Sequence, residues 1–246
     1  MAYSDFTLSS HPIPTSSSSS AWQRVPITEC GEPLVDLKEQ EGRHPLVIIP
    51  QYHAQGIEGA LPTCLVRERV AEMLVAATRW LPRGWRLVVW DGWRPFHVQD
   101  FLFQRYYKHI DTEFPEMPQE EKKERTSAFI SLPSRRPCCP SPHLTGGAVD
   151  VALMDEQDRY APMGTGFDDF SPRAHTRYYE EQPGLGPDER LYLHNRRMLY
   201  WAMIQAGFSN YPEEWWHFDY GNQMWAARKG RSSARYGIVF PLLRPA

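Results

Sequence analysis

Asp150 stands in the middle of the most strand-like segment of the chain, residues 147–154, whose sequence is GAVDVALM. The small and branched apolar side chains around it predict a central, buried strand. A carboxylate inside such a strand is costly unless a partner compensates its charge. A fold that contains this strand must therefore supply a partner for Asp150.

Patterns of helix and strand follow one another along the whole chain. Apolar residues at steps of three and four predict a helix over 63–81, and Pro82 lies just past its end. Three further helices are expected over 95–106, 119–130 and 189–206, the last capped by Asp188 and ended by Gly207. The expected strands are 33–35, 46–49, 85–90, 147–154, 215–220 and 236–243.

The loops between these elements are too irregular for a doubly wound nucleotide-binding fold. The pattern instead favours the α+β class, with a single compact domain in which helices flank a small, largely antiparallel sheet.

The composition and net charge restrict the classes of function that this chain can have. The 246 residues are 41% hydrophobic and 23% charged, which is typical of a folded, soluble protein. A net charge of −3 does not favour binding to nucleic acid or to an anionic membrane, and no apolar run approaches the ~20 residues of a membrane helix. The first ten residues lack the basic and apolar regions of a secretory signal, which predicts a cytoplasmic location.

Residues 1–22 include a run of five serines at 16–20 and several prolines. They predict a flexible N-terminal extension, followed by one domain over 23–246.

The four cysteines form no C-x-x-C motif, and two of them, Cys138 and Cys139, are neighbours. Free thiols are therefore expected, and a thiolate zinc site is not. Any metal in this chain would be held by nitrogen and oxygen ligands.

Residues 141–150, SPHLTGGAVD, contain the first candidate ligands. His143 ends a proline-rich loop, Gly146 and Gly147 permit a tight backbone path, and Asp150 lies in the strand that follows. This pattern places two nitrogen or oxygen ligands on adjacent rigid elements. A loop histidine and a strand aspartate also occur together without any metal, so this segment alone leaves the question open.

Residues 213–218, EEWWHF, contain the second set. Glu214 precedes His217 by three residues and is able to serve as a base beside a third ligand. The alternative is a surface glutamate pair before a strand whose aromatic residues fill the core. Together, the two segments supply two histidines, an aspartate and a free glutamate. A hydrolytic zinc site needs this set, because three ligands leave a fourth position for water and a carboxylate accepts its proton.

Residues 90–95, WDGWRP, place Arg94 between a strand end and a proline. A guanidinium fixed at the rim of a sheet can stabilise the oxyanion of amide hydrolysis. An exposed ion pair with Asp91 is the alternative, and such a pair contributes little.

In this order, the three motifs closely resemble those of the D-alanyl-D-alanine dipeptidases, the family that includes the vancomycin-resistance dipeptidase. The family patterns S-x-H-x-x-G-x-A-x-D, E-W-W-H and W-D-G-aromatic-R-P match residues 141–150, 214–217 and 90–95. The resemblance covers roughly residues 45–220. It implies the compact α+β fold shared by Hedgehog-type domains and other D,D-peptidases.

The resemblance also implies a mechanism. One zinc ion per chain would be bound by His143, Asp150 and His217. Glu214 would act as the general base that activates a metal-bound water, and Arg94 would stabilise the transition state at the carbonyl oxygen.

The substrate implied is the free dipeptide D-Ala-D-Ala, hydrolysed to two D-alanines. Asp168 matches the family position near the substrate ammonium, where a carboxylate is suitable electrostatically. Ser141 is expected to donate to the substrate carboxylate, and Trp215 to form a wall of the pocket.

Two alternatives remain open at this point. A D,D-carboxypeptidase acting on longer peptidoglycan peptides would use the same zinc chemistry, although it would normally require export. An inactive protein that binds peptidoglycan fragments would be expected to lack Glu214 or a ligand, and this chain has them all. The sequence leaves the oligomeric state undetermined.

Overall fold

A five-stranded sheet forms the centre of the computed structural model, which describes residues 8–16 and 20–241. Its strand order is β2-β4-β7-β9-β8, and every pair is antiparallel except β2–β4. The strands are β2 (Leu46–Ile48), β4 (Arg86–Asp91), β7 (Ala148–Met154), β8 (Ser209–Asn210) and β9 (His217–Asp219). The prediction of an α+β domain with a small, largely antiparallel sheet is confirmed.

Strand β7 lies in the middle of the sheet, and all seven of its residues are buried. Its neighbours are β4 on one side and β9 on the other, which explains why it has no polar face. Asp150 therefore lies inside the protein, as its sequence context predicts.

Two long helices cover one face of the sheet, α2 (Glu68–Thr78) and α5 (Pro187–Gln205), and they also contact each other. Helix α2 begins later than predicted, because residues 65–67 form strand β3 (Leu65–Arg67) paired with β1 (Leu34–Asp36). Helix α5 begins at a Gly186 cap, not at Asp188, and Gly207 follows it at φ +106°.

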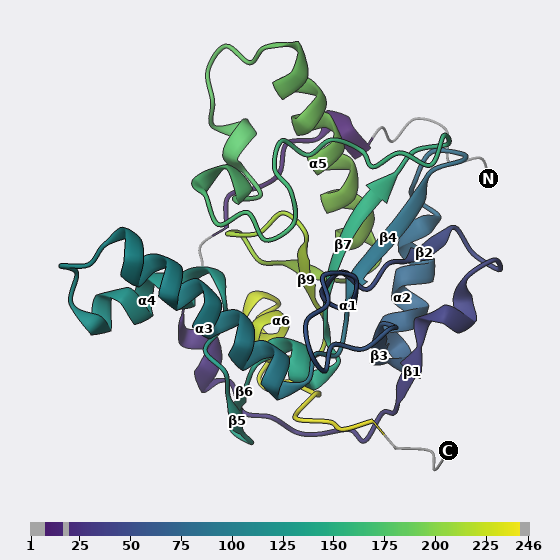
Figure 1. The fold of residues 1–246 in the computed structure, drawn as a ribbon. Coiled ribbons are helices and arrows are strands. Elements are labelled where there is room, and N and C mark those ends of the chain that lie inside the picture. Colours follow the sequence, from purple (N-terminus) through teal and green to yellow (C-terminus); the bar gives the residue numbers. More distant parts are fainter. Residues whose placement is uncertain (1–7, 17–19, 242–246) are drawn as a thin grey trace.

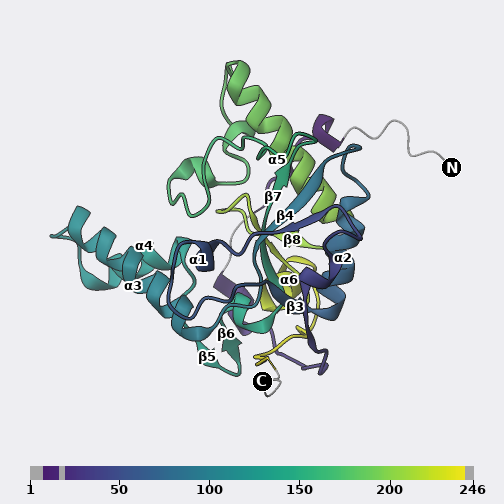
Figure 2. The ribbon, with the colours of Figure 1, turned by 45° about the vertical axis from the view of Figure 1, so that its right-hand side comes forward.

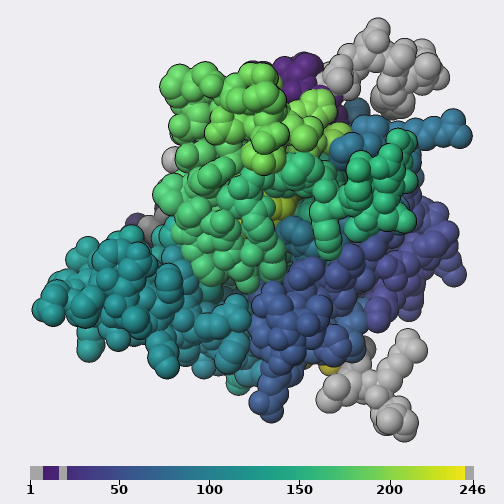
Figure 3. All heavy atoms as spheres, turned by 45° about the horizontal axis from the view of Figure 1, so that its top comes forward, coloured from purple at the N-terminus to yellow at the C-terminus, as the bar shows by residue number. Residues whose placement is uncertain are grey.

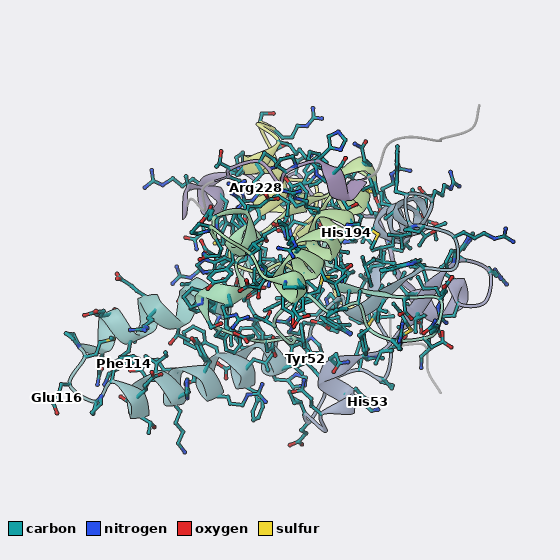
Figure 4. The ribbon with its side chains drawn as sticks, turned by 90° about the horizontal axis from the view of Figure 1, so that it is seen from above. Tyr52, His53, Phe114, Glu116, His194 and Arg228 are labelled. Carbon is teal, nitrogen blue, oxygen red and sulfur yellow. The ribbon has the colours of Figure 1, made fainter. Side chains whose placement is uncertain are left out.

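A helical hairpin extends from the other side of the sheet as an arm (Figures 1 and 2). It consists of α3 (Phe96–Glu113) and α4 (Gln119–Phe129), which contact each other along their length. Figure 4 shows Phe114 and Glu116 at the far end of the arm and Tyr52 near its base. An apolar cluster separate from the main core around the sheet lies between the arm and the rest of the domain. It comprises Tyr52, Ile57, Val98, Leu102, Phe103, Tyr106, Ile110 and Ile130.

The segment between β7 and α5 lies beside the base of this arm, as the green and teal surfaces in Figure 3 show. The ring centroids of Phe170 and Tyr106 are 4.2 Å apart across this contact. The remaining short elements are α1 (Gln51–Ala54), α6 (Gln223–Arg228), β5 (Arg135–Arg136), β6 (Cys139–Pro140), η1 (Leu8–Ser10), η2 (Ser20–Arg24), η3 (Leu37–Gln40), η4 (Pro142–Thr145), η5 (Pro172–Ala174) and η6 (Tyr178–Glu180). Over the described residues, no helix has the length and apolar character to cross a membrane.

The strand predicted over 236–243 does not form in its described part, residues 236–241. Its carbonyl groups accept hydrogen bonds from side chains instead of from a neighbouring strand. Arg67 Nη2 donates to Gly237 O at 3.2 Å, and Trp93 Nε1 donates to Val239 O at 2.8 Å. Residues 242–243 of that prediction lie outside the described part.

Part of the predicted N-terminal extension is packed against the domain. Ile13 is buried, its N–H donates to Glu180 Oε1 at 2.8 Å, and its carbonyl accepts from Arg177. Trp201 Nε1 of α5 donates to His11 O at 2.9 Å. The prediction of a flexible extension is therefore wrong for residues 8–13, because a buried isoleucine anchors them. Residues 1–7 and 17–19 lie outside the description.

We expect Ile13→Ala to lower the free energy of unfolding by about 2 kcal/mol, the low end for a buried isoleucine, because a terminal segment can detach locally. Thr15→Ala, at an exposed position of the same segment, serves as the control. Urea unfolding measures both variants. An Ile13→Ala protein as stable as the control would show that this contact contributes nothing.

Candidate metal centre and active site

A short turn before the first residue of β7 contains His143. Gly146 caps the C-terminal end of helix η4, and its φ of +70° favours glycine. At Gly147, a Cβ atom would lie 2.4 Å from the carbonyl oxygen of Tyr220, so a side chain would block the pairing with β9. Thr145 Oγ1 closes the turn by donating to Pro142 O at 2.6 Å. The tight backbone path predicted from the glycine pair is confirmed.

The sheet register brings the other two candidate ligands together. Asp150 of β7 lies opposite His217 of β9 and, on its other side, opposite Asp91 at the end of β4. Directly opposed residues in an antiparallel pair have Cβ atoms roughly 4.5–5.5 Å apart. Adjacent side chains on the same face are thus a consequence of strand pairing.

Three ligand atoms converge at this point. His217 Nδ1 lies 3.1 Å from Asp150 Oδ1, and His143 Nε2 lies 3.3 Å from His217 Nδ1 and 3.5 Å from Asp150 Oδ2. All three residues are buried. Within residues 8–16 and 20–241, this is the one group of three or more His, Cys, Asp or Glu side chains close enough to share a metal ion.

The outer ring atoms of both histidines have their own partners. His143 Nδ1 lies 2.8 Å from Gly92 O, which can only accept, so this nitrogen carries the proton. His217 Nε2 lies 3.2 Å from Oδ1 of the fully buried Asp219, which also accepts from Asn222 Nδ2 at 2.6 Å. When both outer nitrogens donate and the rings are neutral, each histidine turns a nitrogen lone pair toward Asp150.

Two lone pairs and a carboxylate that face one another require a positive charge between them. The raised pKa of His217 reflects the same demand for positive charge, which a proton meets when no metal is bound. Burial alone would lower the pKa of His217, but the charge of Asp219 and the hydrogen bonds to Asp150 and Asp219 raise it well above its usual value. Burial would raise the pKa of Asp150, yet His143 and His217 hold it far below its usual range. The donor set therefore fits a bound metal cation.

Two successive turns place Glu214 beside this cluster. Glu214 N–H donates to Tyr211 O at 3.2 Å, and His217 N–H donates to Glu214 O at 3.4 Å. Asn210 Nδ2 fixes the turns by donating to Glu214 O and His217 O. Glu214 Oε2 then lies 3.8 Å from His217 Nδ1, and burial raises the pKa of Glu214 to about 8.

Arg94 reaches the cluster from the turn after β4. Its Nε donates to Asp91 Oδ2 at 2.7 Å, and its Nη2 donates to Asp150 Oδ2 at 3.1 Å. The guanidinium carbon lies 4.7 Å from the centroid of the Tyr52 ring. Only 7% of Arg94 is exposed, which excludes the exposed ion pair considered from the sequence.

A cavity of about 40 Å³ connects these groups. By volume it has room for roughly three water molecules at ~10–15 Å³ each. Its polar lining comprises Tyr52, Arg94, Gln99, Ser127, Ser131, His143, Asp150, Asp168, Tyr211, Glu214 and His217, and its apolar lining comprises Leu102, Phe129, Ile130, Phe170, Trp216 and Met224.

Asp168 also lines this cavity, at a non-glycine position with φ of +57°. Its Oδ1 accepts from Tyr52 Oη at 3.2 Å, whereas its Oδ2 is buried without a hydrogen-bond partner. Burial raises the pKa of Asp168 to about 7, although the positive charge of Arg94 acts in the opposite direction. The nearest cation to Oδ2 is Arg105 Nη2 at 4.0 Å, beyond hydrogen-bond distance. A carboxylate oxygen beside a cavity that accepts no hydrogen bond is suited to receive a cationic group of a ligand.

Comparison with known proteins agrees with this geometry. The family model described as D-ala-D-ala dipeptidase matches residues 55–232, which is more than half of the chain. The chain belongs to the D-Ala-D-Ala dipeptidase family. The resemblance inferred from the three sequence motifs is confirmed.

Several curated relatives of this dipeptidase family carry the name D-alanyl-D-alanine dipeptidase. The protein of Synechocystis sp. is 31% identical over 217 residues, which are 82% of this chain and 87% of the relative. The Escherichia coli protein is 26% identical over 147 residues, 55% of each chain. The Enterococcus faecalis protein is 29% identical over 139 residues, 55% of this chain and 62% of the relative.

Two residues expected at the substrate, Ser141 and Trp215, do not line this cavity. Ser141 Oγ accepts from Ser134 N–H at 2.9 Å and donates to Leu132 O at 3.2 Å, so its hydroxyl holds the preceding loop. Trp215 does not line the cavity, and its Nε1 donates to Thr165 Oγ1 at 2.8 Å. The adjacent Trp216 lines the cavity in its place, because the turn before β9 rotates successive side chains in different directions.

No sequence motif identifies Tyr52, Gln99, Tyr211 or Asp219 as parts of the site. The signal for Asp219 was present, because it follows His217 by two residues and so lies on the same strand face. Tyr52 and Gln99 reach the site from helices through tertiary packing.

Proposed function

We propose that this chain is a zinc dipeptidase that hydrolyses the free dipeptide D-Ala-D-Ala to two D-alanines. The observation that carries the proposal is that His143, Asp150 and His217 share one cavity with Glu214 and Arg94. Membership of the dipeptidase family and the names of the curated relatives support the substrate.

Two imidazoles and one carboxylate are a donor set that catalytic zinc uses, with a further position left for water or substrate. When bound, the ion would polarise the peptide carbonyl and make water nucleophilic near neutral pH. We therefore assign His143, Asp150 and His217 as the ligands of one zinc ion per chain.

The other residues have separate tasks. The Glu214 carboxylate is proposed to accept the proton of the attacking water and to return it to the leaving amine. A cation held by the triad lowers the pKa of Glu214 from about 8, which keeps this base ionised at neutral pH. Arg94 is proposed to donate to the oxyanion that forms from the carbonyl oxygen, since its guanidinium stays charged throughout.

Asp168 is proposed to bind the substrate ammonium through its Oδ2, which accepts no hydrogen bond within the protein. Aromatic side chains of Phe129, Phe170 and Trp216 form part of the cavity wall. A carboxylate that binds the substrate ammonium favours a dipeptide with a free amino terminus over a peptidoglycan chain. The cytoplasmic location stays a prediction.

The proposal is tested with the purified, zinc-loaded protein and a panel of dipeptides at equal concentration. We expect D-alanine release from D-Ala-D-Ala and none from L-Ala-L-Ala. Preference for the L,L isomer would refute the assignment.

We expect N-acetyl-D-Ala-D-Ala to be cleaved at least ~10-fold less efficiently than D-Ala-D-Ala. Acetylation removes the ammonium and its close contact with Asp168 Oδ2, and it leaves only the more distant guanidinium of Arg105 at 4.0 Å from that oxygen. The cost is on the order of 1–3 kcal/mol. Comparison of kcat/KM for the two substrates measures this effect. Equal values would favour the D,D-carboxypeptidase alternative.

A further inference from the structure

Gln99, in the first turn of α3, links Arg94 to the wall of the cavity. Its Oε1 accepts from Arg94 Nη1 at 2.7 Å, and its Nε2 donates to Ser131 O at 2.8 Å. Only 3% of the residue is exposed. Ser131 belongs to the segment 127–131, which ends α4 and lines the cavity.

The two partners determine the orientation of the Gln99 amide. A guanidinium can only donate and a backbone carbonyl can only accept, so the amide oxygen must face Arg94 and the amide nitrogen must face Ser131. A side chain at this position that keeps both bonds has to combine an acceptor and a donor. Leucine or methionine would provide neither.

Three side chains thus hold the guanidinium through three different nitrogens. Asp91 binds Nε, Asp150 binds Nη2 and Gln99 binds Nη1, while the ring of Tyr52 lies against the guanidinium plane. Gln99 is the uncharged partner of the three.

We propose that Gln99 is a positioning residue that sets the orientation of the Arg94 guanidinium for transition-state stabilisation. It also ties that orientation to the segment 127–131. This inference rests on the proposed function, in which Arg94 donates to the oxyanion. Gln99 itself acts on the reaction through Arg94.

The test compares Gln99→Met, which removes both hydrogen bonds at similar length, with Gln104→Met at an exposed position of the same helix. We expect Gln99→Met to lower kcat by roughly 10- to 100-fold with little change in KM, the size of effect that misplacement of a catalytic group produces. A phosphinate analogue of the tetrahedral intermediate should lose affinity by a similar factor. The zinc content should stay at one per chain, and Gln104→Met should behave as the wild type.

Gln99→Glu distinguishes the effect of the bond to Arg94 from that of the bond to Ser131. It keeps an acceptor for Arg94 and loses the donor to Ser131, so its loss of kcat should be smaller than that of Gln99→Met. If the two losses are equal, the bond to Arg94 does not matter and the proposal is wrong. This variant also answers the question if Gln99→Met does not fold.

A double-mutant cycle identifies the residue through which Gln99 acts. In the Arg94→Lys background, Gln99→Met should change kcat by less than about twofold, whereas independent effects would multiply and overturn the inference. Loss of activity in Gln99→Met with full activity in Arg94→Lys would instead remove the oxyanion role of Arg94 from the proposed function, and the inference with it.

A readout independent of catalysis uses metal-free protein labelled with ¹⁵N-arginine. The Nε–H signal of Arg94, identified by its absence in Arg94→Lys, should shift in Gln99→Met and stay in place in Gln104→Met. An unchanged signal in Gln99→Met would show that Gln99 does not orient the guanidinium.

Discussion

Replacing His143 with alanine is expected to remove both the metal and the activity. The substitution deletes one of the three proposed ligands and leaves His217 and Asp150 at 3.1 Å without the third donor. The contribution of a catalytic metal is several kcal/mol of transition-state stabilisation, so kcat/KM should fall by at least ~10³-fold. Metal analysis of the purified protein and turnover of D-Ala-D-Ala measure the two losses together.

His194→Ala provides the matched control. His194 lies on α5 at an exposed position and is not a member of the ligand cluster (Figure 4). This variant should keep one zinc per chain and wild-type turnover. A His143→Ala protein with the same zinc content and turnover as the control would show that the ligand assignment is wrong.

Glu214→Gln is expected to keep the metal and lose most of the rate. The amide is nearly isosteric with the carboxylate but cannot accept the proton of the attacking water. Loss of a positioned general base costs ~10²–10⁴-fold in kcat. Since Glu214 Oε2 lies 3.8 Å from His217 Nδ1 and outside the three-ligand set, zinc content should remain at one per chain.

The adjacent Glu213 offers the control for this prediction. Its Oε2 lies 3.0 Å from His175 Nε2, and it does not line the cavity. Glu213→Gln should therefore retain kcat. If Glu214→Gln is purified without metal, Glu214 is a ligand; if it is as active as Glu213→Gln, it has no catalytic role.

Sequence patterns predicted the parts of the fold that depend on local periodicity. The body of helix α2 and the central strand β7 were found because their apolar spacing is regular. Helix α3 continues to Glu113, seven residues beyond the predicted end at 106. The exceptions have tertiary causes. Residues 65–67 extend the helical pattern of α2, yet they pair with β1, and Ile13 is anchored by Glu180, which lies 167 positions away.

The site was predictable to the extent that its residues lie in short motifs. His143, Asp150, Glu214 and His217 occupy two such segments, and strand pairing brings them together. Gln99 illustrates what the sequence does not reveal. Its role depends on Ser131, which lies 32 positions later, just after the second helix of the arm. No local pattern distinguishes Gln99 from any other glutamine on a helix.

The most direct test of the account is a zinc titration of the metal-free protein, followed by D-alanine release from D-Ala-D-Ala. We predict that turnover is absent without metal, rises linearly with added zinc and reaches its plateau at one zinc per chain. Full turnover in the metal-free protein, or no D-alanine release at any zinc level, would contradict the proposal of a zinc dipeptidase.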